Sequence, residues 1–313
     1  MEPGLLKSAD WPLLIDLYFF LGGLAAGAFV IATIANLLDS RRYRDVVRVG
    51  YYLAFLTILP APIFLIVDLG MPSRFLHMLM VAKPDVTIGM SAIGVGPFHF
   101  KFFSPMNVGA WGLGAFALLA FLAALAILLE DTKRSDLSGF KRWVGLIGSL
   151  FAFLIAAYPG VLLGATARPL FISAHWLGAL FLAVSASTGG AAIALILSLL
   201  GGQARESLSR VMRVTAFALI IQLVALILFM ISVLGAGSEG ISKALAVLLS
   251  GPYSVTFWLG AVVIGLVAPL VLQFGGVIKK AAPSMVALVS VLVLVGGFLV
   301  KYVIIAAGQV ALS

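Results

Sequence analysis

Eight long hydrophobic stretches fill almost all of this chain of 313 residues. At ~1.5 Å per helical residue, each is long enough to cross the ~30 Å hydrocarbon core of a bilayer as an α-helix. Hydrophobic residues make up 63% of the chain and charged residues only 10%, which excludes a soluble protein with an ordinary polar surface. The sequence therefore predicts an all-α integral membrane protein with eight transmembrane helices.

The predicted helices form a single polytopic membrane domain over residues 1–313, with one long external loop at 70–106. The start of the chain has no small-residue cleavage pattern, so we expect the first helix to remain in the mature protein. The helices are predicted at 13–38, 50–69, 107–129, 143–166, 170–200, 211–234, 253–275 and 284–307.

Basic residues in the connections predict the orientation, because basic loops stay on the cytoplasmic side. The loops 39–49, 130–142, 201–213 and 276–283 carry thirteen Lys and Arg, whereas the N-terminal segment and the loops on the other side carry six. Both termini are therefore predicted to lie outside. The net charge of +8 follows from this asymmetry, and the sequence has no basic stripe with interleaved aromatics, so no nucleic-acid partner is expected.

The residues available for chemistry are few. The sequence has no cysteine and three histidines, of which only His175 lies within a predicted span. Iron–sulfur clusters need thiolates, and a membrane haem needs axial ligands on facing helices. We expect no haem, no iron–sulfur cluster and no metal site in this chain. Phosphate-loop and hydrolase motifs are missing as well.

Polar side chains at membrane depth are costly and usually face a cavity, a partner or a ligand. In the predicted orientation they gather toward the outer ends of the helices, which predicts a site near the outer face. The candidate residues are Asp16, Asp68, Tyr158, Arg168, His175 and Lys301.

Asp16 is the most informative of these, because a carboxylate within an apolar helix requires a cation, such as Lys301 or Arg168, or exchanges a proton. Tyr158 precedes Pro159 and Gly160, where we expect a break in the helix. The proline removes a backbone donor there, and the phenol hydroxyl needs a partner.

Structural alternatives stand beside these functional interpretations. Asp68 with Arg74 could simply terminate a helix, and Lys301 could extend to the outer headgroups without a partner. Glycines at small-residue spacing, such as Gly23 and Gly27, indicate close helix packing.

The external loop 70–106 is long and unusually apolar for a solvated segment. Such a segment either lies along the membrane interface or docks another protein. We expect it to form, together with Arg168, the docking surface for a partner subunit.

The motifs resemble those of the NrfD-like, polysulfide reductase membrane subunits, and the resemblance spans the whole chain. They are YFFLGGLAAG at 18–27, DLGMPSR at 68–74, SPMNVGAW at 104–111, YPGVLLG at 158–164, FLAVSASTG at 181–189, GGFLVKY at 296–302 and Gly308-Gln309. Two features depart from the family pattern. Lys301 stands where the family more often has Arg, and 84–103 looks like an insertion.

The resemblance implies two four-helix bundles in a bacterial or archaeal cytoplasmic membrane. It also implies a quinone-binding anchor used in electron transport and anaerobic respiration, with either menaquinone or ubiquinone. The external partners would be an iron–sulfur subunit and a catalytic, molybdopterin-type subunit. By this resemblance Tyr158 contacts the quinone head group and Asp16 belongs to the same site. The residues themselves allow Asp16 or His175 to accept a proton, and Arg168, Asp68 and Lys301 complete the predicted site.

A protein of this kind is a subunit of a quinone-linked oxidoreductase and not a complete enzyme, because the electron acceptor must come from another chain. Two alternatives remain open on the sequence. One is an ion- or solute-translocating module, suggested by Asp16, Lys301 and the helix-interrupting prolines Pro62 and Pro159. The other is a scaffold without its own quinone site.

Overall fold

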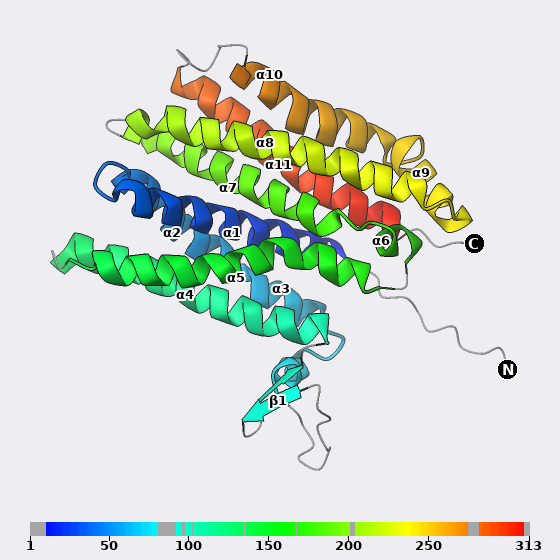
Figure 1. Ribbon diagram of the computed structural model, residues 1–313, viewed down its shortest axis with the longest axis horizontal. Helices are drawn as coiled ribbons and strands as arrows, with labels where there is room; N and C mark the ends of the chain where they lie inside the picture. Colours follow the sequence, from blue (N-terminus) through cyan, green and yellow to red (C-terminus); the bar gives the residue numbers. More distant parts are fainter. Residues whose placement is uncertain are drawn as a thin grey trace.

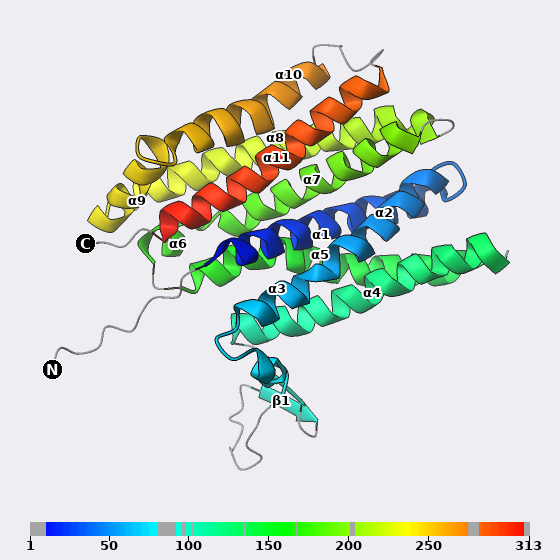
Figure 2. The ribbon, with the colours of Figure 1, turned by 180° about the vertical axis from the view of Figure 1, so that it is seen from behind.

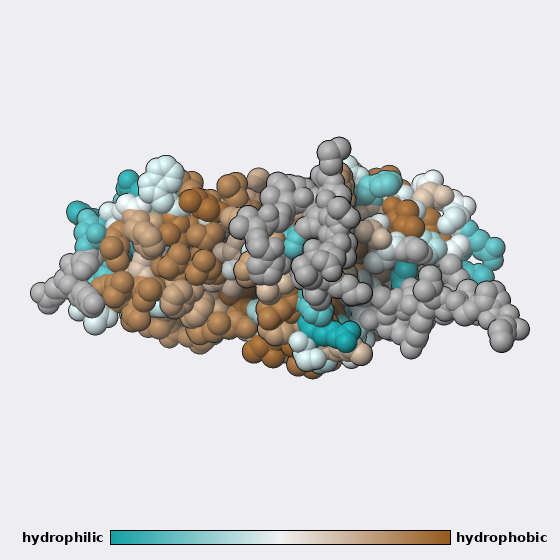
Figure 3. Space-filling model, turned by 90° about the horizontal axis from the view of Figure 1, so that it is seen from below, coloured by the Kyte–Doolittle hydropathy of each residue, from teal (hydrophilic) through white to brown (hydrophobic). Residues whose placement is uncertain are grey.

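The computed structural model describes residues 11–80, 92–95, 98–101, 103–133, 136–166, 168–200, 204–274 and 282–309. Within these residues eight helical segments are long and apolar enough to cross a membrane, which confirms the predicted number of spans and, apart from one small hairpin, the all-α class. The helices run side by side as a flattened bundle (Figures 1 and 2). Figure 3 shows one long face of the bundle, with a broad hydrophobic surface and hydrophilic side chains toward both ends.

Within the described ranges, the second span is interrupted, the seventh is irregular, and the other six are single helices. The fifth begins at Leu177 and not at the predicted residue 170, so His175 lies before it. The elements in chain order are α1 Leu13–Asp39, α2 Arg44–Ile58, α3 Pro60–Asp68, η1 Pro72–Met78, β1 Ala92–Val95, β2 Phe98–Lys101, α4 Pro105–Lys133, α5 Ser138–Gly164, α6 Pro169–Ile172, α7 Leu177–Leu200, α8 Ala204–Gly235, α9 Glu239–Leu249, η2 Thr256–Val267, α10 Ala268–Phe274 and α11 Pro283–Gly308.

Both described ends of the chain lie at the same end of the bundle, which we call the terminal end. There the backbone N–H of Trp11 donates to Gln309 Oε1, and Gln309 Nε2 donates to Trp11 O at 3.1 Å. The opposite end, which we call the loop end, is where α1 ends and α2 begins, and where the facing helix ends of the pairs α4–α5, α7–α8 and α10–α11 lie. These four connections are the ones with the excess of basic residues.

The second span begins earlier than predicted and is broken. Helix α2 starts at Arg44, so part of the predicted loop 39–49 is helical. The break lies between Ile58 and Pro60, because Pro60 has no backbone N–H to continue the ladder and instead starts α3. Pro62, which was predicted to interrupt a helix, lies inside α3, so that prediction is wrong. Pro159 likewise lies inside an unbroken α5. The break predicted at Pro159 is therefore wrong, because a membrane helix packed closely against its neighbours tolerates a proline.

Helix α1 is central in the bundle. It packs against α2 and α5 on one side and against α7 and α11 on the other. The close packing predicted for the glycines is confirmed at the α1–α7 crossing, where a Cβ on Gly27 would clash with the backbone of Ser185 and a Cβ on Gly189 with that of Gly27. Whether the helices divide into two four-helix bundles stays a prediction.

A small β-hairpin lies beside the terminal end of α4, within the predicted external loop. Its strands β1 and β2 are antiparallel. The side chain of Asn107, in the first turn of α4, fastens this hairpin: its Oδ1 accepts from Lys101 N at 2.7 Å, and its Nδ2 donates to Met78 O at 2.5 Å. Trp111 Nε1 donates to His99 O at 3.1 Å. Residues 81–91, 96–97 and 102 of the predicted loop lie outside the described residues.

Candidate functional site

Tyr158 lies near the terminal end of α5 and packs closely against α4. A Cβ atom on Gly109 would clash with the Tyr158 phenol ring and hydroxyl, so this glycine makes room for the ring. Tyr158 is 8% exposed. Among the described residues its hydroxyl has no hydrogen-bond partner, although a buried phenol usually finds one.

Tyr18 on α1 is the neighbour of Tyr158, and sequence reasoning did not single it out as a site residue. The two phenols are close enough to interact electrostatically. Tyr18 is 3% exposed, and its hydroxyl also has no hydrogen-bond partner within the described part of the chain. The two tyrosines therefore bring two unpaired hydroxyl groups into an otherwise apolar interface between α1, α4 and α5.

An apolar groove with a volume of about 530 Å³ lies along the α4–α5 interface, and neither Tyr158 nor Tyr18 lines it. Gly112 and Leu154 line it, and they lie one helical turn from Gly109 and Tyr158 on the same two helix faces. The hairpin strand β2, together with Trp111, forms the terminal end of the groove. A flat ring with an apolar tail matches such a groove in size and polarity.

Asp16 lies on a different face of α1 from Tyr18. Two residues along a helix correspond to a rotation of about 200°, so the two side chains point in nearly opposite directions. Asp16 is 3% exposed, and its Oδ1 is buried without a hydrogen-bond partner. It is close enough to Tyr302 of α11 to interact electrostatically, which places it on the α11 side of α1.

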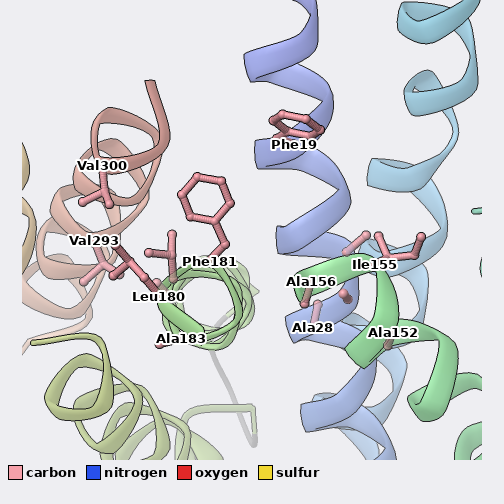
Figure 4. Packing of buried hydrophobic residues seen from close by; sticks show 14 of the residues in the cluster. Phe19, Ala28, Ala152, Ile155, Ala156, Leu180, Phe181, Ala183, Val293 and Val300 are labelled. Carbon is pink, nitrogen blue, oxygen red and sulfur yellow. The ribbon is translucent and has the colours of Figure 1, made fainter. Parts of the chain in front are cut away.

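Lys301 is buried where α1, α7 and α11 meet, 1% exposed. Its Nζ donates to Phe19 O at 2.7 Å and to Ser185 Oγ at 3.5 Å, and it lies 5.3 Å from the centre of the Phe181 ring. Figure 4 shows Phe181 projecting from α7 into the space between α11 and α1.

The environment of Lys301 excludes both sequence interpretations of this residue, the ion pair with Asp16 and the extension to the headgroups. Gly23 packs directly beside the ammonium group, since a Cβ there would lie 2.5 Å from Lys301 Nζ. No ion pair joins Lys301 to a carboxylate in the described ranges, Asp16 included. The side chain therefore neither extends to the headgroups nor pairs with Asp16. Instead, helix carbonyl, hydroxyl and aromatic groups surround it.

The other predicted site residues lie apart from the tyrosine pair. Arg168 is buried at the start of α6, and its Nη1 donates to Gln309 O at 2.7 Å, at the C-terminal end of α11, where a cation is favourable. It therefore fastens two helix ends, and little of it is exposed for docking. His175 is exposed in the turn between α6 and α7, and Asp68 is exposed at the end of α3.

The predicted residues thus occupy separate places in the structure. Tyr158 is with Tyr18, while Asp16 and Lys301 are on the far side of α1. Gly109 and Asn107 have roles that the sequence did not assign, although both stand in the SPMNVGAW motif. The signal was present there, but a single glycine or asparagine does not indicate which neighbour it contacts.

Comparison with known proteins gives consistent matches over the whole chain. The family model described as "Polysulphide reductase, NrfD" matches residues 2–313. The sequence is 25% identical to the protein NrfD homolog of Haemophilus influenzae, over 97% of this chain and 95% of that protein. It is 26% identical to a polysulfide reductase chain of Wolinella succinogenes, over 96% and 93%. A shorter match of 77 residues, 29% identical, covers 25% of this chain and 18% of a selenate reductase subunit of Mesobacillus selenatarsenatis.

Proposed function

Because this chain belongs to the NrfD polysulphide reductase family of membrane proteins, we propose that it is the quinone-reactive membrane subunit of a reductase complex. In this proposal it exchanges electrons between the membrane quinone pool and an external iron–sulfur subunit, which serves a molybdopterin-type catalytic subunit. Its relatives include proteins named as parts of polysulfide and selenate reductases, which supports the role in a complex.

The observation that carries the proposal is the pair of phenols one helical turn from the lining of an apolar groove. A quinone ring needs hydrogen-bond donors for its oxygens and an apolar slot for its tail. Tyr158 and Tyr18 offer two O–H donors, and the groove along α4 and α5 offers the slot. In this assignment Tyr158 donates a hydrogen bond to one ring oxygen and Tyr18 orients the ring.

Oxidation of a quinol releases two electrons and two protons, so the protein must also handle protons. The electrons leave for the partner subunit, because this chain has no cysteine to hold a cluster. We propose Asp16 as a proton acceptor, since its Oδ1 is buried without a partner near the terminal end. It lies across α1 from Tyr18, so it does not directly contact a ring bound at the tyrosine pair.

The test uses the complex purified with its partner subunits. Tyr158→Phe should slow quinol-dependent turnover and leave activity with a soluble artificial electron donor unchanged. Loss of one hydrogen bond to a neutral group corresponds to roughly two- to tenfold in binding, so a larger fall in rate assigns Tyr158 to the proton-coupled step as well. Tyr52→Phe, which alters a partly buried phenol of α2, is the matched control.

The proposed proton acceptor is tested in the same assay. Asp16→Asn should change the pH dependence of quinol turnover, because it removes the titrating group but keeps the shape of the side chain. Wild-type kinetics in both Tyr158→Phe and Asp16→Asn would overturn the proposed site.

The rival function is a translocating module, and it rests on the buried Asp16 and Lys301 and on the interrupted second span. Purification separates the two: the proposed subunit should bring quinone and an iron–sulfur partner with it, and a transporter should bring neither. Recovery of the partner without quinone would favour the scaffold.

A further inference from the structure

A second cavity lies at the loop end, far from the tyrosine pair. It has a volume of about 700 Å³ and opens between α8 and α10. One stripe of α8 forms most of the wall, because its residues recur at spacings of three and four. The lining residues are Ser209, Met212, Arg213, Ala216, Phe217, Ile220, Gln273 and Phe274.

The cavity is polar at its mouth and apolar further in. Helix α8 runs inward from the loop end, so Ser209 and Arg213 lie nearest the surface, and Phe217 and Ile220 lie one and two turns deeper. Ala216 is buried, and its small side chain leaves space in the cavity that a larger side chain would fill. This order of polarity is that of a phospholipid, with its headgroup at the surface and its acyl chain below.

Gln273 supplies the observation that points to a ligand. Both its Oε1 and its Nε2 are buried and have no hydrogen-bond partner among the described residues. A buried amide left in this way is unfavourable, since it has lost water without gaining a replacement. A ligand that offers both an acceptor and a donor would satisfy it.

Arg213 adds the charge. Its Nε donates to Ser209 O of the same helix at 3.3 Å, and within the described ranges it forms no ion pair. Other basic residues at this end behave differently: Arg44 and Arg48 both pair with Asp131, at 2.8 and 3.2 Å. Arg213 thus keeps guanidinium donors available at the mouth of the cavity.

We propose that this cavity binds one anionic phospholipid whose headgroup has a hydroxyl, such as phosphatidylglycerol. Arg213 donates to the phosphate oxygens, in the manner of basic pockets between transmembrane helices. Gln273 Nε2 donates to a phosphate or ester oxygen, and Gln273 Oε1 accepts from the headgroup hydroxyl. Phe217 and Ile220, one and two turns deeper than Arg213, hold the acyl chain.

The binding test titrates the purified, full-length protein in detergent with phosphatidylglycerol and with phosphatidylcholine, and counts bound lipid by native mass spectrometry. The wild type should retain one phosphatidylglycerol in preference to phosphatidylcholine. Arg213→Gln should weaken this binding by about tenfold or more, as expected for loss of a hydrogen bond to a charged group. The matched control is Arg142→Gln, which removes an exposed arginine near the same end that does not line the cavity. Equal retention of the two lipids by the wild type, or equal binding by the two variants, would overturn the proposal.

Gln273→Leu tests the amide separately and keeps the proposal falsifiable if Arg213→Gln proves unstable. In delipidated protein this variant should be at least as stable as the wild type, because it removes an unsatisfied group. Added phosphatidylglycerol should raise the melting temperature of the wild type but raise that of Gln273→Leu less. A partner protein or another part of the chain filling the cavity would instead leave the response to lipid the same in both, and that result would refute the lipid site.

Discussion

At the scale of single residues, the close approach of Gly109 sets the position of Tyr158, the residue proposed to donate a hydrogen bond to the quinone ring. A methyl group on Gly109 would occupy the place of the phenol. Gly109→Ala should therefore displace Tyr158 and slow quinol-dependent turnover by at least as much as Tyr158→Phe does. Gly114→Ala is the matched control, because nothing lies within 4 Å of a Cβ at that position of the same helix. Steady-state quinol oxidation by the purified complex measures both, and equal rates would show that the ring does not depend on this contact.

Lys301 gives a second prediction at this scale, one that concerns stability. Its ammonium group is buried without an ion-pair partner among the described residues, so a change to an apolar side chain of similar length removes a desolvated charge. Lys301→Met should alter the free energy of unfolding by less than about 1.5 kcal/mol. Lys301→Ala leaves a cavity and should cost about 2–5 kcal/mol.

Thermal unfolding in detergent compares the two variants of Lys301. If Lys301→Met destabilised the protein as much as Lys301→Ala, the hydrogen bond from Lys301 Nζ to Phe19 O would be holding α1 and α11 together. A folded Lys301→Met protein that has lost quinol turnover would assign the charge to function.

At the scale of elements, the hairpin depends on one side chain of the neighbouring helix. Asn107 bonds to the backbone of both β2 and the η1 segment. Asn107→Ala should loosen the hairpin, costing roughly 1–3 kcal/mol for the groups left unpaired. If the hairpin is the partner's docking surface, recovery of partner subunits should fall while membrane insertion is unchanged.

Co-purification from the membrane measures this effect, with Ser104→Ala as the control from the same turn. Ser104 Oγ accepts only a long hydrogen bond, 3.4 Å, from Asn107 N. Unchanged partner recovery in Asn107→Ala would mean that the partner binds elsewhere on the terminal end.

The sequence predicts elements of this fold unevenly, for physical reasons. Span number follows from hydrophobic length, which depends on the bilayer and not on neighbours. The positions of helix breaks do not follow from hydrophobic length. Pro60 interrupts a span and Pro159 does not, because the outcome depends on whether packing satisfies the freed backbone groups. The sequence also did not predict the π-helical η2 or the amphipathic α9. By composition alone, η2 belongs to one apolar span and α9 to a plain loop.

The sequence indicates the depth of the candidate residues better than their direction. Asp16 in the first turn of α1 and Tyr158 near the end of α5 both lie toward the terminal end, where the polarity pattern puts them. That pattern holds no information about the surroundings of α1, where Tyr18 faces Tyr158 and Asp16 faces Tyr302. Spacing gives the rotation between two side chains of one helix, but only the packed structure shows which neighbour stands on each side.

At the scale of the whole molecule, orientation in the membrane is the prediction on which the outer-face site depends. Thirteen basic residues in the loop-end connections, against six in the N-terminal segment and the connections on the other side, should hold the loop end in the cytoplasm. A periplasmic reporter such as alkaline phosphatase should be active when fused after Ser313 and inactive when fused at Ser135. The reverse result would move the tyrosine pair to the cytoplasmic side and exclude an external partner.

The hydrogen bonds between Trp11 and Gln309 join residues 298 positions apart. In biosynthetic terms, the first helix enters the bilayer long before the helix that completes its surroundings exists. Until α11 is made, Lys301 does not yet donate to the Phe19 carbonyl and Tyr302 does not yet lie near Asp16, so a protein that stops early leaves this side of α1 uncovered by the last span. Because Trp11 and Gln309 are hydrogen-bonded, a short linker could join the two ends of the chain. New termini made by cutting the chain between α4 and α5 would then lie on the other side of the membrane.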